Sequence, residues 1–200
     1  MSQITHQVIK PKVLYYGTPV IILSTLNEDG STNISPLSSS WALGNCLVLG
    51  LGLEGKAIEN LKNRPECVVN VPSSDLWTRV EALAPLTGKN PVPEDKLQNS
   101  FRYEKDKFTA AGLTAQGSKQ VQPDRILECP LQIECEARNI RIPEHDPSFA
   151  IVEAEALVVH AHENIVIHEN HVNTKEWNPL IYNFRHYFGL GQELGKTFRA

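Results

Sequence analysis

Hydrophobic positions along the chain come mostly in short runs of strand length, separated by polar turns. The first run, residues 19–26 (PVIILSTL), is rich in β-branched side chains and stops at residues 27–30 (NEDG). The Asp-Gly pair favours a tight turn, because glycine accepts a positive φ angle. Extended character resumes over residues 31–36, so these segments predict a β-hairpin.

The next part of the chain places one helical segment between two apolar runs. Residues 45–53 (NCLVLGLGL) predict a buried strand, and residues 67–71 (CVVNV) predict another. Between them, residues 55–63 (GKAIENLKN) carry apolar side chains at helical spacing until Pro65 interrupts the pattern. We therefore expect one short helix between two strands.

The segment at 76–108 is polar and contains prolines, and we expect a helical or irregular excursion over the surface. The Ser-Ser-Asp cluster at 73–75 is suited to cap a helix that begins near Leu76.

Strand character returns at residues 127–139, where apolar and polar side chains alternate. The alternation predicts a buried face of Leu131, Ile133 and Cys135 and a solvent face of Gln132, Glu134 and Glu136. Residues 149–162 and 165–168 predict a second hairpin that turns at Glu163-Asn164. Because short strands outnumber helices, the pattern favours a mainly β, closed or partly closed antiparallel barrel.

Composition narrows the possible functions. The chain has 200 residues, 41% hydrophobic and 21% charged, as expected of a globular protein with a single domain over 1–200. A net charge of −4 without a Lys/Arg-rich run argues against nucleic acid as a partner. Residues 1–12 lack the apolar core of a signal peptide, and no segment approaches the roughly 20 apolar residues of a membrane span. We expect a cytoplasmic protein without membrane contact.

The four cysteines do not suggest chemistry. They lie in apolar stretches with no Cys-x-x-Cys pair, which predicts reduced, buried thiols rather than disulfides or zinc ligands: Cys46, Cys67, Cys129 and Cys135. A group of histidines at 160, 162, 168 and 171 lacks a carboxylate or cysteine at metal-ligand spacing. We interpret them as exposed strand histidines, and a metal-binding or interaction barrel is the less favoured alternative.

Three further stretches are candidates for binding. Residues 33–40 (NISPLSSS) offer short hydroxyls and backbone N–H groups to a flavin ring or a phosphate, or form a solvated loop. Residues 50–55 match Gly-x-Gly-x-x-Gly, but the following helix is too short for a dinucleotide-binding crossover. The start of that helix, with Lys56 beside it, could still hold a phosphate. Residues 182–191, rich in aromatics, could line a ring pocket or dock the C-terminal segment.

Taken in order, five motifs resemble the flavin-reductase-like, FMN-binding split-barrel family, which includes flavoredoxins and the reductase components of two-component monooxygenases. The motifs are Asp29-Gly30 leading into Asn33-x-Ser35-Pro36-x-Ser38-Ser39-Ser40; the run 47–53; Lys56-x-x-x-Asn60-Leu61 running into Val68-Val69-Asn70; Asp106-Lys107-Phe108 followed by Ala111-Gly112-Leu113-Thr114; and Leu131-x-x-Glu134-Cys135. The resemblance spans most of the chain. It implies a split β-barrel of the antiparallel Greek-key type.

The resemblance also implies which residues surround the flavin. In the family, the serine-rich stretch and the following strand wrap the flavin, while the lysine and the helix start face its phosphate. These roles fall on Asn33, Ser35, Pro36, Leu37, Ser38, Ser39, Ser40, Gly50, Leu51, Gly52, Lys56 and Asn60. No catalytic residue and no metal ligand is implied.

The implied function is that of an FMN-binding oxidoreductase: an NAD(P)H-dependent flavin reductase with FMN at a homodimer interface. NADH or NADPH would be the electron donor, and free flavin, oxygen or a partner such as a monooxygenase the acceptor. Two departures from the family pattern concern Ala57, where a threonine is frequent, and Phe149, where many reductases have histidine. They leave open a non-catalytic FMN-binding carrier or sensor.

Overall fold

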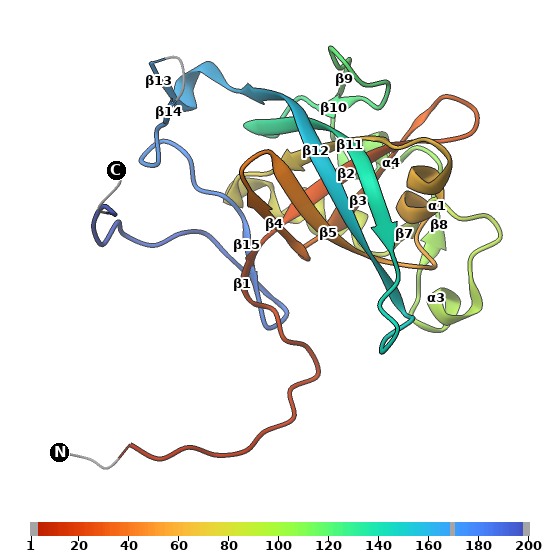
Figure 1. Cartoon of the computed structure of the whole chain (residues 1–200), viewed down its shortest axis with the longest axis horizontal. Coiled ribbons are helices and arrows are strands. Elements are labelled where there is room, and N and C mark those ends of the chain that lie inside the picture. Colours follow the sequence, from red (N-terminus) through yellow and green to blue (C-terminus); the bar gives the residue numbers. More distant parts are fainter. Residues whose placement is uncertain (1–3, 169–170, 198–200) are drawn as a thin grey trace.

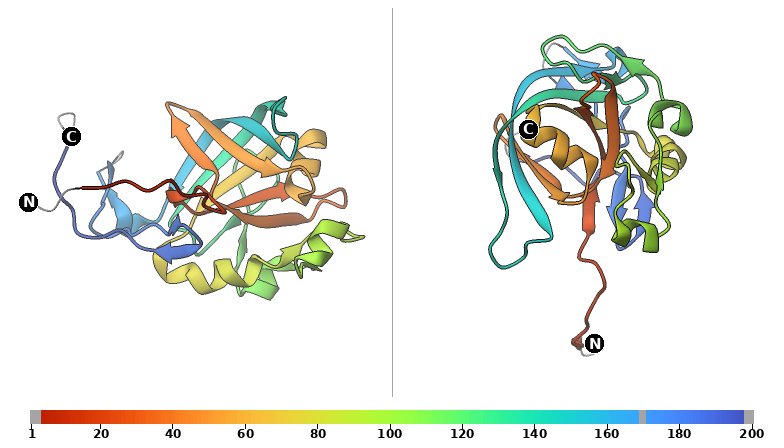
Figure 2. Two further views of the ribbon diagram at one scale, coloured as in Figure 1. Left: turned by 90° about the horizontal axis from the view of Figure 1, so that it is seen from below. Right: turned by 90° about the vertical axis from the view of Figure 1, so that its right-hand side faces the viewer.

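Seven antiparallel strands form a curled sheet that wraps around one helix (Figure 1; Figure 2, right). In this computed structural model, which describes residues 4–168 and 171–197, the order across the sheet is β3-β2-β6-β11-β12-β5-β4. The strands are β2 (Ile21–Leu26), β3 (Thr32–Leu37), β4 (Ser40–Leu43), β5 (Cys46–Gly52), β6 (Glu66–Val71), β11 (Leu131–Arg141) and β12 (Phe149–Ala161). The enclosed helix is α1 (Lys56–Asn63).

The two edges of this sheet are β3 and β4, which are adjacent in sequence but not hydrogen-bonded to each other. The sheet therefore curls into a barrel that stays split at this seam. The consecutive strands β5 and β6 are separated in the sheet by β12 and β11, which is a Greek-key arrangement. The predicted mainly β, antiparallel split barrel is confirmed.

Shorter elements lie outside the sheet. The helices are η1 (Ser74–Leu76), α2 (Trp77–Leu83), α3 (Glu94–Gln98), α4 (Lys107–Ala111) and η2 (Glu163–Ile165). Small sheets pair β7 (Leu86–Thr87) with β8 (Arg102–Tyr103), β9 (Ala115–Gln116) with β10 (Arg125–Ile126), and β13 (Val166–Ile167) with β14 (His171–Val172). A fourth small sheet joins β1 (Tyr16–Pro19), β15 (Ile181–Asn183) and β16 (His186–Phe188). Before α2, Ser73 precedes η1 without making the predicted side-chain cap.

Apolar side chains are buried on both faces of the sheet. Inside the barrel, Leu23 and Leu49 pack with Ile58 of α1. On the outer face, Ile22 and Ile34 belong to a second cluster with residues of α2 and α4. Successive residues of β2 thus enter different cores, which explains why its apolar run does not alternate with polar positions.

The predicted solvent face of β11 is wrong. Gln132 and Glu134 are 3% and 0% exposed. Glu134 accepts hydrogen bonds from the backbone N–H groups of Lys119 (2.7 Å) and Gln120 (2.6 Å). Burial alone would raise the pKa of Glu134, but these backbone hydrogen bonds, together with the contact to His160, outweigh it and lower that pKa. The loop with Lys119 and Gln120, which precedes β11 in the chain, covers this face, and the alternation within the strand does not indicate that contact.

The predicted second hairpin is also wrong. Strand β12 continues to Ala161 and pairs with β11 on one side and β5 on the other. The segment at 165–168 instead contributes β13, whose partner is β14. Two long neighbours provide β12 with more ladder hydrogen bonds than the short segment after Glu163 could. No helix within residues 4–168 and 171–197 is long and apolar enough to span a membrane, and the first three residues of the segment 1–12 lie outside the described part.

Candidate functional site

A cleft of about 1120 Å³ opens on one side of the barrel. Its floor comes from β3 and β5, and the start of α1 closes one end. The opposite wall comes from α2 and the hairpin of β15 and β16. A cleft of this size has room for a ligand of cofactor dimensions, for which pockets usually measure about 300–1,000 Å³.

Most of the sequence-predicted site residues meet in this cleft: Ser35, Pro36, Leu37, Ser38, Gly50, Leu51, Gly52 and Lys56 line it. Asn33 lines an adjoining pocket of about 300 Å³, which shares Lys56 with the cleft. Ser39, Ser40 and Asn60 line neither cavity.

Most of the stretch 33–40 belongs to strand β3, and Ser40 begins β4, so only Ser38 and Ser39 form a connection between strands. Ser39, between these strands, accepts a backbone hydrogen bond from Gly50 (2.8 Å), and its hydroxyl contacts the Tyr15 hydroxyl at 2.8 Å. A Cβ atom on Gly50 would lie 2.8 Å from the Ser39 Cβ. Glycine at position 50 therefore permits a close approach of backbone, a role unrelated to a dinucleotide fingerprint.

Asn60 connects α1 to the β2–β3 hairpin beside the site. It is fully buried and donates to Thr25 Oγ1 (3.1 Å) and Asn27 Oδ1 (2.9 Å). Asn33, which is 2% exposed, reaches the same Thr25 hydroxyl at 3.4 Å. These contacts tie α1 to the β2–β3 hairpin and position the neighbouring backbone.

Lys56 is already engaged by carboxylates. Its Nζ donates to Glu28 Oε1 (2.9 Å) and Glu59 Oε1 (2.6 Å), and Lys89 also pairs with Glu59. Burial alone would lower the pKa of Lys56, but hydrogen bonds to the two carboxylates outweigh it and raise that pKa. Hydrogen bonds from Lys56 and Lys89 lower the pKa of Glu59 to about 2. A phosphate at Lys56 would have to compete with two carboxylates.

Lys107, which the sequence reasoning did not assign to the site, also lines the cleft. It is 3% exposed, and its Nζ donates to the Ile34 carbonyl (3.0 Å) and lies 3.5 Å from Ser35 Oγ. In the described part of the chain, no carboxylate forms an ion pair with it. Burial, with a contribution from nearby Lys96, lowers the pKa of Lys107 to about 8. A buried cation without a carboxylate partner is suited to an anionic ligand.

Lys96 of α3 also lines the cleft and adds a second positive charge near Lys107. Its Nζ lies 5.5 Å from the centre of the Phe101 ring, and burial lowers its pKa. The sequence signal for Lys107 was the motif Asp106-Lys107-Phe108, in which Asp106 caps α4 by accepting from the Thr109 backbone N–H (3.1 Å). The motif predicted the helix start but not the burial of its lysine.

The histidine and cysteine predictions need partial correction. His160 and His162 are half-buried, and their Nε2 atoms contact Glu134 Oε1 (2.7 Å) and the Leu127 carbonyl (2.9 Å), while His168 and His171 are exposed. No group of three His, Cys, Asp or Glu residues able to hold a metal occurs among residues 4–168 and 171–197. All four cysteines are free, but Cys46 is exposed, because it opens a strand next to the sheet edge.

Comparison with known proteins identifies the family. The family model described as a flavin reductase like domain matches residues 13–191. The chain belongs to the flavin-reductase-like family. The matched range includes every residue that lines the cleft.

Relatives of this flavin-reductase-like chain agree in extent and fold. It is 59% identical over 192 residues to the uncharacterized protein YdfE of Bacillus subtilis, covering 96% of this chain and 93% of that one. Flavoredoxin of Desulfovibrio vulgaris (Miyazaki F) superposes with a TM-score of 0.80 at 20% identity, covering 98% and 99% of the two chains. Nitrilotriacetate monooxygenase component B from Bacillus cereus gives 0.73 at 14% identity, covering 93% and 89%.

Proposed function

We propose that the cleft binds FMN and that the protein is an NAD(P)H-dependent flavin reductase. The observation that carries this proposal is the unpaired, buried Lys107 at one end of a cleft whose floor is otherwise apolar or uncharged. Membership of the flavin-reductase-like family supports a flavin as the ligand.

The residues present fit the parts of FMN. At the lysine end, Lys107 and the Ser35 hydroxyl are suited to the phosphate, because a charge-assisted hydrogen bond to an anion is about twice as strong as a neutral one. In the middle, Leu37 and Leu51 offer an apolar surface to a ring. We assign the phosphate to Lys107 rather than to Lys56, which two carboxylates already neutralise.

The chemistry requires little from the chain itself. When bound, FMN supplies the ring that exchanges a hydride with a nicotinamide, so no acid–base side chain is needed and we name no catalytic residue. The protein binds the phosphate, orients the ring against β3 and β5, and limits the access of water from one side. Of the two departures from the family pattern, Ala57 lines the cleft, whereas Phe149 pairs with Gly52 in the sheet and does not line it.

An anaerobic titration of FMN-loaded protein with NADH and with NADPH tests this function. Bleaching of the yellow colour at one equivalent of donor supports a reductase. A protein that binds FMN but is not bleached by either donor is the non-catalytic carrier or sensor, and a protein that binds no FMN contradicts the proposal altogether.

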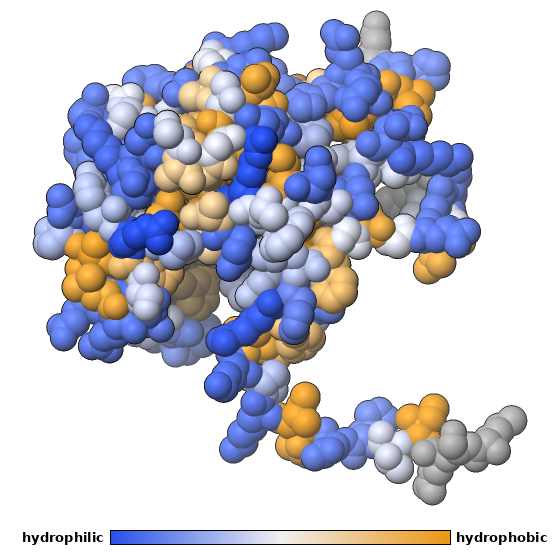
Figure 3. Space-filling view, turned by 180° about the vertical axis from the view of Figure 1, so that it is seen from behind, coloured by the Kyte–Doolittle hydropathy of each residue, from blue (hydrophilic) through white to orange (hydrophobic). Residues whose placement is uncertain are grey.

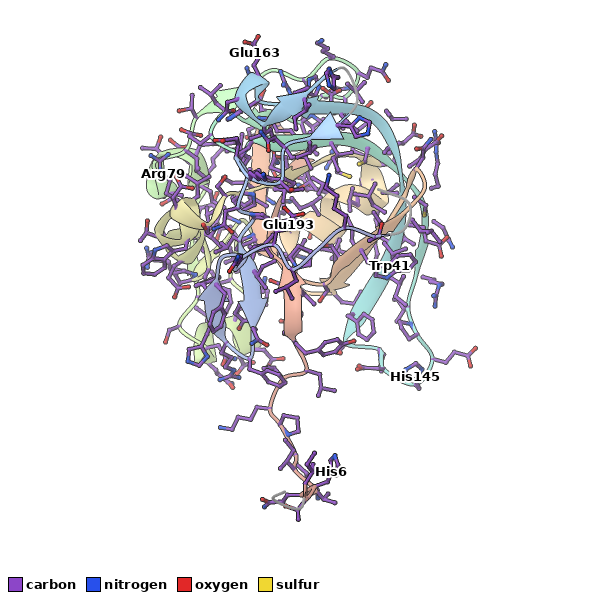
Figure 4. All side chains as sticks on the ribbon, turned by 90° about the vertical axis from the view of Figure 1, so that its left-hand side faces the viewer. His6, Trp41, Arg79, His145, Glu163 and Glu193 are labelled. Atoms are coloured by element: carbon purple, nitrogen blue, oxygen red, sulfur yellow. The ribbon has the colours of Figure 1, made fainter. Side chains whose placement is uncertain are left out.

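We further propose a homodimer, in which a second copy covers exposed apolar residues around the seam. The N-terminal arm extends away from the barrel with Val8 94% and Leu14 70% exposed (Figure 3). Trp41 of the edge strand β4 is 59% exposed, and Figure 4 shows it beside the barrel, away from His6 at the tip of the arm. Sedimentation velocity with and without FMN tests this assembly, and a stable monomer that retains FMN contradicts it.

The electron acceptor is proposed by class only. The similar fold of the Bacillus cereus protein, named as a monooxygenase component B, supports a partner oxygenase as acceptor besides free flavin or oxygen. Free thiols at all four cysteines suit a location in the reducing cytoplasm.

A further inference from the structure

The hairpin of β15 and β16 gives the cleft a second cationic end. Arg185, in the turn of this hairpin, lines the same cleft as Lys56, Lys96 and Lys107. The hairpin and the lysine-bearing helices α1 and α3 lie on opposite sides of the molecule (Figures 1 and 2). The cleft is therefore lined by cations from two sides of the molecule, and we call the side that carries Arg185 the arginine end.

Arg185 is available to a ligand. Its side chain is exposed, and within residues 4–168 and 171–197 its guanidinium makes no hydrogen bond or ion pair. Glu81, an acidic residue that also lines the cleft, accepts the hydrogen bond of the Tyr187 hydroxyl at 3.0 Å. Glu81 forms no ion pair with Arg185, so within the described residues the charge of Arg185 is not compensated by a carboxylate.

The turn that carries Arg185 is held in place. Phe184 and Arg185 have φ angles of 43° and 70°, in the left-handed region that non-glycine residues rarely adopt. The Phe184 N–H donates to the Tyr15 carbonyl (2.7 Å), and His186 Nδ1 contacts the Phe184 carbonyl (3.0 Å). Surrounding contacts thus maintain a backbone conformation that projects Arg185 from a fixed point.

Aromatic rings stand beside this arginine. Tyr182 and Tyr187 both line the cleft, with ring centres 5.7 Å apart. Tyr15 packs edge-on against Tyr182 at 5.3 Å, and Trp77 contacts Tyr187 at 6.3 Å. Rings fixed in this way offer a flat surface to a heteroaromatic ring, and arginine offers its planar fork to a phosphate.

We propose that this end binds the phosphate-bearing part of a second ligand, a nicotinamide dinucleotide, through Arg185, with Tyr182 and Tyr187 beside its adenosine. The inference rests on the proposed function, because a reductase must bring two rings together while each ligand carries its own phosphates. If the FMN phosphate occupies the lysine end of the cleft, the phosphates of the nicotinamide donor must lie at the opposite side, which carries Arg185. The group that meets Arg185 is a pyrophosphate or a 2′-phosphate, which share this chemistry.

The test is isothermal titration calorimetry of FMN-loaded protein with ADP-ribose and with 2′-phospho-ADP-ribose. Arg185→Met keeps a long side chain at this position but removes the charge. We expect the Kd for at least one probe to rise roughly tenfold, because one charge-assisted hydrogen bond is lost. Arg185→Lys should recover part of the affinity, and FMN affinity should stay unchanged. Arg102→Met, which removes an exposed arginine outside the cleft, is the matched control.

The pattern of losses separates the two phosphates and the two proposals. Equal losses for both probes indicate the pyrophosphate, and a larger loss for the second probe indicates the 2′-phosphate; both outcomes support the inference. Unchanged affinity in Arg185→Met, or loss of FMN together with the probes, overturns it. Wild-type protein that binds FMN but neither probe also overturns it and leaves the flavin proposal standing. If wild type binds no FMN, the flavin proposal fails, and the same titrations on the unloaded protein still decide the role of Arg185.

Discussion

Two lysines near one end of the cleft have opposite electrostatic environments. Lys56 lies between Glu28 and Glu59, and the pKa of Lys56 is raised. Lys107 is buried against the Ile34 carbonyl without a carboxylate, and its pKa is lowered to about 8. The first arrangement stabilises the fold locally, whereas the second leaves a positive charge that no carboxylate of the described residues pairs with and that an anionic ligand can compensate. A lysine at a helix start is therefore a weaker indicator of phosphate binding than a lysine whose charge is left uncompensated.

Removing the charge of Lys107 should have the largest effect. In Lys107→Met we expect the Kd for FMN to rise roughly 10- to 150-fold, the equivalent of a lost charge-assisted hydrogen bond of about 1.5–3 kcal/mol. Riboflavin, which has no phosphate, should lose far less. Equilibrium dialysis with both flavins measures the difference, with the exposed Lys62→Met as control and thermal melts to monitor the fold. Equal losses of affinity for FMN and riboflavin would show that Lys107 does not bind the phosphate.

Raising the pH should weaken FMN binding by neutralising Lys107. From pH 7 to 9.5 the Kd for FMN should rise about tenfold, because Lys107 deprotonates near pH 8 while the phosphate, with a second pKa near 6, stays doubly charged. Riboflavin affinity should stay flat. The stability of the unloaded protein should change in the opposite direction: between pH 8 and 10.5 the unfolded chain binds more protons at this residue, so the free energy of unfolding rises. FMN affinity that is constant up to pH 9.5 contradicts the role of Lys107.

Removing a carboxylate partner of Lys56 should leave its charge less compensated, as the charge of Lys107 already is. In Glu59→Gln, both Lys56 and Lys89 lose a carboxylate, and we expect FMN to bind about two- to fivefold more tightly, the range of a partly exposed ion pair. Calorimetric titration measures this gain. An unchanged or weaker affinity would show that this end of the cleft does not sense the charge around Lys56.

Deleting the Lys56 pair as a unit should have the smallest effect. The double variant Lys56→Met with Glu59→Gln keeps the net charge, and we expect the Kd for FMN to stay within about twofold, because a partly exposed ion pair contributes little net energy. A loss of FMN affinity similar to that of Lys107→Met would show that Lys56, not Lys107, binds the phosphate.

The sequence predicted the elements more reliably than the environments of individual side chains. The helix at 55–63 and the strand at 67–71 were predictable, because their patterns depend on near neighbours in the chain. The burial of Glu134 was not, since its hydrogen-bond donors come from a loop at Lys119 and Gln120. Lys107 escaped assignment for the same reason: its burial arises only when α4 packs against β3, and no spacing in the sequence reports that contact.

A crystal structure of the protein with bound FMN tests the central claim most directly. We predict the flavin ring in the cleft between β3 and β5, with a phosphate oxygen within hydrogen-bond distance of Lys107 Nζ, roughly 2.7–3.2 Å. The ion pairs of Lys56 with Glu28 and Glu59 should remain intact. A phosphate bound to Lys56 with these carboxylates displaced, or FMN bound outside the cleft, would contradict the account.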